Sequence, residues 1–399
     1  MHMRISIADL RPAILATLAF TALGAARATG QQADSWKPAV RVQAEVRYDD
    51  NPFLLTAGRK SRLDAVSSAD SQSGRFRGME SETDAMPIPS LELGIAGPGL
   101  GGRTAEIGAE VAYEANLRNA ERRHAEVGFG IEQSLSRAGR VRLAADWRPG
   151  YFHKNYLAGA VDLNADDNIG PDERRYASGT SNDVDVALRY RHRLVKSTKD
   201  RPLGVTTEIE VGYLDRSYDA PFAGRSRSGP GAGGELTFQL GRRWAIGLDY
   251  AFASLGGDPA QEVLILNEND FGQDFNGNLS TSDDSARAAV LVDRSRAEHE
   301  LGVAVQGELG KAATIKVGYG RRMRNFSSSE PFDVVNRDRR DVRNDLAAAL
   351  DVRLASGLHL ALGARRAAQS TNRAGDPGST GEVADYTRYV ASVGLRYRF

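Results

Sequence analysis

Charged side chains recur at every second position in several segments of this 399-residue chain. In residues 40–48, Arg41, Gln43, Glu45 and Arg47 share one side of an extended backbone, and apolar residues occupy the other. A row of guanidinium and carboxylate groups could orient a hydrophilic solute, and it could also pair with the charges of a neighbouring strand. Either role requires elements that bring several such rows to one surface.

The charged rows belong to segments in which apolar and polar residues alternate, as in a strand with one dry and one wet face. Fourteen segments carry the pattern, namely 40–48, 88–96, 104–115, 124–135, 140–148, 183–194, 206–214, 234–241, 243–253, 297–309, 314–320, 344–354, 357–365 and 386–399. We therefore predict an all-β chain of about 14 strands, with 12 or 16 strands as alternatives.

The connectors between these segments alternate strictly between short and long. The short ones, mostly with glycine, lie at 98–102, 136–139, 195–204, 241–243, 310–312 and 355–357, and the long ones at 49–87, 116–122, 153–182, 215–233, 254–295, 321–342 and 366–384. Short turns at one rim and long loops at the other are typical of a bacterial outer-membrane barrel. We predict an antiparallel up-and-down transmembrane barrel over residues 39–399, preceded by a short periplasmic segment at 29–38.

Aromatic residues test this prediction independently, because amphipathic rings favour the two membrane interfaces. The pattern places two groups of aromatic side chains on the outward faces, one near the long loops and one near the short turns. They are Tyr48, Tyr113, Trp147, Tyr213, Tyr250 and Tyr319 in the first group, and Tyr190, Trp244 and Tyr397 in the second.

The first 28 residues predict a cleaved signal peptide. Arg4 and Arg11 precede a short apolar run at 12–23, and small residues follow up to Ala28. This order is typical of export, and the run is too short to span a bilayer, although an uncleaved anchor is the alternative. Together with the barrel pattern, it predicts a location in the outer membrane of a Gram-negative bacterium.

The last segment ends in an outward-facing series that includes Leu395, Tyr397 and Phe399. A terminal phenylalanine after an alternating strand resembles the assembly signal of outer-membrane proteins. The resemblance implies that the Bam assembly machinery is a partner, and the barrel pattern implies contact with outer-membrane lipid and lipopolysaccharide.

The composition excludes several classes of function. The chain has no cysteine, so it has no disulfide, no thiolate metal site and no cysteine nucleophile. Its 52 basic residues equal its 52 acidic residues, which argues against a nucleic-acid partner. A mean hydropathy of −0.42 argues against several membrane-spanning helices. No motif predicts a cofactor or a metal site.

The inward positions of the predicted strands are rich in charge, and the signs are grouped by strand. The basic positions are Arg41, Arg47, Arg142, Arg148, Arg189, Arg191, Arg193, Arg388, Arg396 and Arg398. The acidic positions are Glu106, Glu110, Glu114, Glu126, Glu132, Glu208, Glu210, Glu235, Asp249, Glu298, Glu300 and Glu308. Opposed basic and acidic walls would create a field that orients solutes. The alternative is that these charges only neutralise one another.

The first strand runs into Tyr48-Asp49-Asp50-Asn51-Pro52-Phe53, with Thr56 close behind. This stretch resembles the opening of the β-barrel porin-2 type proteins, some of which belong to exopolysaccharide gene clusters. The resemblance covers about ten residues and implies passage of a polysaccharide. The alternative is a loop start of Asp, Asn and Pro that any barrel could use.

Two long loops and four histidines are the remaining candidates for chemistry. The acidic loops at 153–182 and 254–295 could bind Ca²⁺, but neither has EF-hand spacing, so solvated loops are the favoured interpretation. The longer loop could also fold into the lumen. Of the histidines, His192 and His299 are predicted to face lipid, with Ser295 the hydroxyl nearest His299, and His124 and His359 to face the lumen without a ligand cluster.

These observations favour a porin-like channel for hydrophilic solutes or a secreted glycan. The first alternative is a barrel that does not conduct and binds a surface polymer or partner protein. The more remote alternative is a lipid-modifying enzyme of the outer membrane, which would need a serine or acid beside a histidine on the lipid-facing surface. The chain contains no GxSxG element, and we predict that it is not an enzyme.

Overall fold

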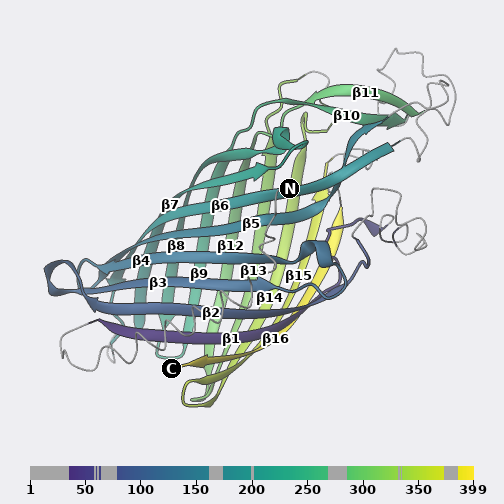
Figure 1. Ribbon diagram of the computed structural model, residues 1–399. Helices are drawn as coiled ribbons and strands as arrows, with labels where there is room; N and C mark the ends of the chain where they lie inside the picture. Colours follow the sequence, from purple (N-terminus) through teal and green to yellow (C-terminus); the bar gives the residue numbers. More distant parts are fainter. Residues whose placement is uncertain are drawn as a thin grey trace, which may run out of the picture.

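The chain folds into a closed antiparallel β-barrel (Figure 1). The computed structural model describes residues 36–57, 60, 63, 79–160, 174–198, 202–267, 285–330, 333, 335–372 and 385–399. The predicted signal peptide at 1–28 lies outside these residues, as do most of the acidic stretches proposed for Ca²⁺.

Fourteen long strands build the barrel, and two shorter ones form a separate hairpin. The barrel strands are β1 (Lys37–Asp49), β2 (Asp84–Pro98), β3 (Thr104–Glu114), β4 (His124–Ser134), β5 (Gly139–Ala160), β6 (Arg174–Val195), β7 (Leu203–Tyr218), β8 (Arg227–Leu240), β9 (Trp244–Leu255), β12 (Arg296–Leu309), β13 (Ala313–Phe326), β14 (Arg340–Ala355), β15 (Leu358–Thr371) and β16 (Tyr386–Arg398). The predicted fold class, with its 14 strands, is confirmed.

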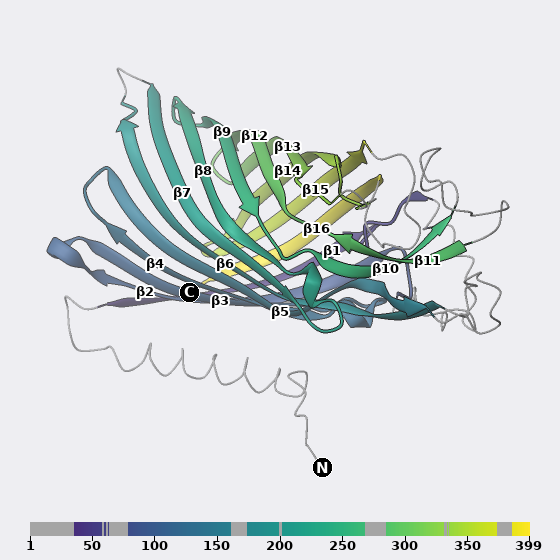
Figure 2. The ribbon, with the colours of Figure 1, turned by 90° about the horizontal axis from the view of Figure 1, so that it is seen from above.

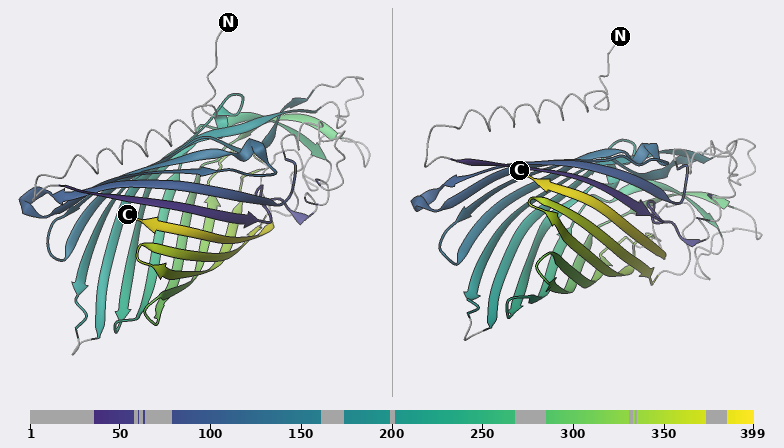
Figure 3. Two further views of the ribbon diagram at one scale, coloured as in Figure 1. Left: turned by 60° about the horizontal axis from the view of Figure 1, so that its bottom comes forward. Right: turned by 90° about the horizontal axis from the view of Figure 1, so that it is seen from below.

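Each barrel strand pairs with its neighbour in the chain, except that β9 pairs with β12 and β1 pairs with β16. The β1–β16 pairing closes the barrel and aligns Arg41 with Arg398 and Asp49 with Val390. Figure 3 shows the first and last strands side by side. Both the start of β1 and the end of β16 lie at the rim formed by the short connectors, which we call the turn end; the opposite rim is the loop end.

The turn end is compact because glycines adopt conformations that other residues avoid. Gly241, Gly310 and Gly357 have φ values of 65°, 73° and 74° and stand in three of the turns. Positive φ costs glycine nothing and strains residues with a Cβ atom, so these turns reverse the chain within a few residues. A short 3₁₀ helix, η2 (Leu100–Gly102), forms another of them.

The outside of the barrel is apolar and exposed. Leucine and valine side chains at outward positions are commonly about half exposed, for example Val211 at 50% and Leu395 at 50%. Aromatic residues stand at two levels of this surface. Trp147 is 47% exposed on the loop side, where it pairs with Val127, and Trp244 is 46% exposed on the turn side. Such a band with aromatic borders is what a bilayer would cover.

The strands continue past the outer aromatic level, and here the predicted boundary was wrong. The segment 153–182 was expected to be a loop, but β5 runs to Ala160 and β6 begins at Arg174. The pairing shifts register after Arg148, beside Gly150, whose φ is 57°. Beyond the apolar band the outward face no longer needs apolar residues, so the two-residue alternation ends although the strands continue.

The predicted loop 254–295 also contains regular structure. Strands β10 (Ala260–Asn267) and β11 (Ser285–Val292) form a two-stranded sheet of their own. The hairpin lies beside β5 and the short helix η5 (Ala223–Arg225) at the loop end (Figures 1 and 2). In both views its described strands project from the rim.

Among the residues described, no helix is long and apolar enough to cross a membrane.

Candidate solute-binding lumen

Ion pairs between different strands line much of the inner wall. Several predicted basic positions are held by a carboxylate: Arg47 by Glu114 at 2.6 Å, Arg148 by Glu126 at 2.5 Å, and Arg189 by Glu210. Glu300 and Glu298 are bound by arginines of β13. These pairs favour local neutralisation over fully separated walls of one sign.

Other pairs involve carboxylates that the sequence analysis did not assign to the lumen wall. Glu92 binds Arg41, and Asp351 binds Arg396 at 2.5 Å. Asp49 accepts hydrogen bonds from Arg388 across the closing seam, at 3.0 and 2.9 Å from its Nε atom. Glu92 and Asp49 stand on strands adjacent to those of their arginines, and Asp351 stands two strands away from Arg396, so only the register of the sheet identifies them as partners.

Most of the remaining predicted lumen residues line the wall without an ion pair to a described residue, whereas Glu132 binds Arg140 at 2.8 Å. Arg142, Arg398, Glu106 and Glu132 border a pocket on the β1–β5 side, and Arg191 and Arg193 border one at the turn end. Glu208, Glu235, Asp249 and Glu308 make no ion pair within the part of the chain that the structure describes. The hydroxyl of Thr237 donates to Glu235 at 2.6 Å.

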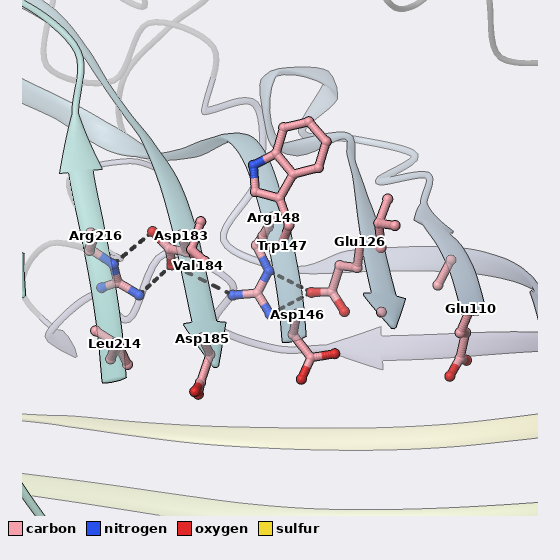
Figure 4. A pocket seen from close by; sticks show the side chains of 13 residues that line it. Glu110, Glu126, Asp146, Trp147, Arg148, Asp183, Val184, Asp185, Leu214 and Arg216 are labelled. Atoms are coloured by element: carbon pink, nitrogen blue, oxygen red, sulfur yellow. Dashed lines mark hydrogen bonds and ion pairs between the residues drawn. The ribbon is translucent and has the colours of Figure 1, made fainter. Parts of the chain in front are cut away.

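An acidic zone lies midway along β3, β5 and β6 (Figure 4). Glu110, Asp146 and Asp185 border a cavity of about 420 Å³ and form no ion pair with any described residue. Arg148 lies between Glu126 and Asp183 above them, and Arg216 binds Asp183 at 2.5 Å. The wall therefore changes character along the strands, from paired charges to uncompensated carboxylates.

A strongly basic cavity of about 220 Å³ occupies the loop end of the lumen, and we call it the arginine cavity. Residues from nearly every side of the barrel line it. Its cationic side chains are Arg122, Lys154, Arg216, Arg225, Arg227, Arg294, Arg296, Arg324, Arg339 and Arg343. Asp341 is the one acidic residue among the described lining residues.

Aromatic rings support the guanidinium groups of this cavity. Arg225 lies over the ring of Tyr156, with 3.7 Å from its Cζ atom to the ring centroid, and Arg339 lies 4.7 Å from that of Phe326. Arg122 lies 5.1 Å from the centroids of both Phe53 and Tyr151. These cation–π contacts hold the arginines in place without neutralising them.

His153 packs among the aromatic rings of this cavity. It lies on β5 six residues after Trp147, nearer the loop end, and is therefore beyond the apolar band of the barrel. Its ring stacks on Tyr218 at 5.1 Å, and its Nε2 atom is 2.8 Å from the hydroxyl of Ser181. Burial lowers the pKa of His153 well below its usual value, and the charges of Arg216 and Arg122 lower this pKa further. The imidazole is therefore neutral at pH 7 and adds a polar group without adding charge.

The motif at 48–53 positions part of this cavity. Asp49 pairs with Arg388, and Asp50 accepts a hydrogen bond from the backbone N–H of Tyr389 at 2.5 Å. The fully buried amide of Asn51 donates to the carbonyls of Leu55 and Thr387, at 2.9 and 3.0 Å. Phe53 then lines the cavity and packs edge-on against Phe152.

His124 is not alone, contrary to the prediction. Glu114, His124 and Glu126 bring one potential metal-ligand atom each within 4.8 Å of one another. The prediction failed because Glu114 comes from the adjacent strand β3, whose register with β4 the sequence does not reveal, whereas Glu126 lies on β4 two residues after His124. Arg47 and Arg148 already pair with these carboxylates, so the positive charge that a cation would supply is present.

The two outward histidines lie next to tyrosine hydroxyls, and His359 lies next to a carboxylate. Outward His192 and His299 lie 3.1 and 2.9 Å from the hydroxyls of Tyr190 and Tyr250. Ser295, the candidate hydroxyl near His299, hydrogen-bonds to the backbone of Gly257 instead. His359 lies 2.7 Å from Asp351 in the lumen.

The aromatic residues predicted for the outer surface are exposed to differing degrees. Tyr48, Tyr213, Tyr250 and Tyr319 are 44% to 52% exposed on the outer surface, and Tyr113 is partly exposed. Tyr190 and Tyr397 are 39% and 40% exposed nearer the turn end, where Tyr397 packs against Phe399.

Sequence reasoning missed most of the arginine cavity. Arg122, Arg216, Arg227 and Arg324 stand in segments that were interpreted as loops. The available signal was a moderate excess of arginine over acidic residues in these segments. Their convergence depends on strand register across the whole barrel.

No family model matches the chain, and no curated protein matches it. The resemblance of residues 48–53 to the β-barrel porin-2 type proteins therefore stays a prediction from those residues. Among solved structures, the chain is similar to the outer-membrane channel DcaP of Acinetobacter baumannii, with 7% identity over 92% of this chain and 97% of the other, at a TM-score of 0.43.

Two further structures show a similar level of likeness. One is the CymD monoaromatic hydrocarbon channel, with 9% identity, coverage of 91% and 88%, and a TM-score of 0.42. The other is an anion-selective porin from Comamonas acidovorans, with 10% identity, coverage of 92% and 99%, and a TM-score of 0.38. Similarity at this level does not establish the function of this chain. Its fold is established by its own strand pairing.

Proposed function

We propose that the protein is a channel in the outer membrane of a Gram-negative bacterium and that it passes small hydrophilic solutes. The observation that carries the proposal is the contrast between the two faces of one closed barrel. Apolar and aromatic side chains cover the outside, and charged residues and cavities line the inside. A barrel of fourteen strands is wider than the eight-stranded barrels that side chains can fill.

The proposed orientation follows from the two rims. In such barrels the short turns face the periplasm and the long loops face the exterior. The arginine cavity would then be the first part of the lumen that a solute meets from outside. Outer-membrane lipid, lipopolysaccharide and the Bam assembly machinery are the partners that this location requires. Passage of a secreted polysaccharide is supported by the resemblance at residues 48–53 alone.

The experiment is reconstitution of the refolded, heat-modifiable protein into planar lipid bilayers. We expect discrete, stable conductance steps in KCl, because a water-filled lumen conducts ions. Swelling of proteoliposomes in solutions of small sugars measures solute passage in parallel. Folded barrel that inserts into the bilayer and produces no stable steps at any voltage would refute the channel and favour a barrel that only binds at the surface.

A further inference from the structure

The arginine cavity has a charge imbalance that nearby carboxylates do not remove. Asp183 binds Arg216, Glu298 binds Arg296 and Arg324, and Asp341 binds Arg339. Arg122 and Arg227 have no carboxylate partner among the described residues. Positive charge enclosed by a low-dielectric wall produces a strong local field, which attracts anions.

Arg227 is the clearest case. The sheet register places it directly opposite Arg216, so two guanidinium groups face one another across β7 and β8. Like charges at opposed positions destabilise a sheet. Asp183 binds Arg216 through both of its oxygens, at 2.9 and 2.5 Å, whereas the buried Nε atom of Arg227 has no hydrogen-bond partner among the described residues.

Arg122 also lines the cavity. It ends the short helix η3 (Ala120–Arg122), between β3 and β4. It is 8% exposed, and its hydrogen bonds go to the hydroxyl of Tyr151 and, at 3.4 Å, to the carbonyls of Phe152 and His153. These neutral acceptors satisfy N–H groups of the Arg122 guanidinium, but they do not neutralise its positive charge. A buried charge without a counter-charge is costly, so such an arrangement persists where a ligand supplies the missing charge.

We propose that the arginine cavity binds a small oxyanion with two or more negative charges, held by Arg122 and Arg227 together with Arg216. Carboxylate and phosphate groups both accept paired hydrogen bonds from guanidinium groups, so they share this chemistry. At about 220 Å³ the cavity is smaller than the pockets that enclose drug-sized ligands. Because it lies inside the barrel, the ligand is a soluble ion and not a lipid headgroup. This inference rests on the proposed channel function and names its solute class.

Isothermal titration calorimetry on the folded barrel in detergent tests the site without requiring conductance. Citrate and pyrophosphate are the two probes, and glucose is the neutral control. We expect wild-type protein to bind at least one of the anions and not glucose, and the anion that binds identifies the preferred group. The double variant Arg122→Gln/Arg227→Gln should bind that anion at least tenfold more weakly, because each guanidinium supplies charge-assisted hydrogen bonds.

The control variant is Arg242→Gln, which removes the same kind of charge from a turn at the opposite rim and should bind like wild type. Heat-modifiable mobility establishes that each variant is folded. Absence of binding by either anion, or equal binding by the double variant, would overturn the proposed site. A protein that conducts and binds neither anion refutes this site alone, whereas one that binds without conducting refutes the channel and leaves the anion site intact.

Discussion

Asp49 shows how much of the barrel depends on one carboxylate. It is 1% exposed, and it joins the first strand to the last through Arg388. Its Oδ1 atom also accepts the backbone N–H of Asn51 at 2.9 Å, so it orients the start of the following segment. A carboxylate with several charge-assisted hydrogen bonds at a seam contributes more than a surface pair does.

We predict that Asp49→Asn lowers the free energy of unfolding by about 2 kcal/mol, because it leaves the guanidinium of Arg388 without its counter-charge. Urea unfolding in detergent micelles, followed by tryptophan fluorescence, measures the change. Asp338→Asn is the matched control. Asp338 is paired with Arg337 at 3.8 Å but its side chain is 89% exposed, so its replacement should have an effect near zero. Equal stability of Asp49→Asn and wild type would contradict the role of the seam pair.

At the scale of elements, residues 51–55 act as a short inward-packed segment between β1 and the following loop. Phe53 is 3% exposed, and it packs with Leu55, Leu63, Met79 and Phe152 while bordering the arginine cavity. The segment thus contributes apolar packing on one side and narrows the passage on the other.

We predict that Phe53→Ala increases single-channel conductance, because it removes a ring from the cavity wall. It should also lower the free energy of unfolding by about 3 kcal/mol, the low end of the cost of truncating a buried phenylalanine. Planar-bilayer recordings and urea unfolding measure the two effects. Leu117→Ala, at a 58% exposed position outside this cluster, is the control and should change neither. Unchanged conductance in a folded Phe53→Ala protein would place the narrowest part of the passage elsewhere.

The elements differ in how far the sequence predicts them. Where a strand crosses the apolar band, as at Val42, Val46 and Tyr48, one face must be apolar and the other polar, and the alternation is readable. The extended part of β5 from Tyr151 to Ala160 faces no such requirement and contains two further shifts of register, so it was expected to be loop. The hairpin of β10 and β11 was missed for the same reason.

The candidate site was harder to predict than the strands. The inward side of a charged row follows from alternation alone, which is how Arg148 and Glu126 were identified. Which arginine meets which carboxylate depends on register between strands, and the presence of Arg122 and Arg227 in one cavity depends on how the strands that carry them are arranged around the barrel. No local pattern contains that information.

At the scale of the whole molecule, the C-terminal residue contributes to closure of the barrel, and it also carries the predicted assembly signal. The backbone N–H of Phe399 donates to the carbonyl of Val40 at 3.0 Å, and its ring packs edge-on against Tyr397 at 4.6 Å. The side chain is 74% exposed on the outer surface, where either lipid or an assembly factor could contact it.

We predict that Phe399→Asp reduces the amount of folded barrel in the outer membrane severalfold, because a charge replaces the ring on a lipid-facing surface. The fraction of heat-modifiable protein in isolated outer membranes is the measurement. Phe399→Tyr keeps an aromatic ring and should assemble like wild type. Undiminished assembly of Phe399→Asp would count against the C-terminal residue as an assembly signal.

The pairing of β1 with β16 also determines when the barrel can close during folding. Arg41 and Arg398 are neighbours in the sheet although nearly the whole chain separates them. Closure must therefore wait until β16 has been synthesised, and until then the growing sheet keeps two unpaired edges that invite association with other chains. A chain of this architecture needs protection from such association until β16 pairs with β1.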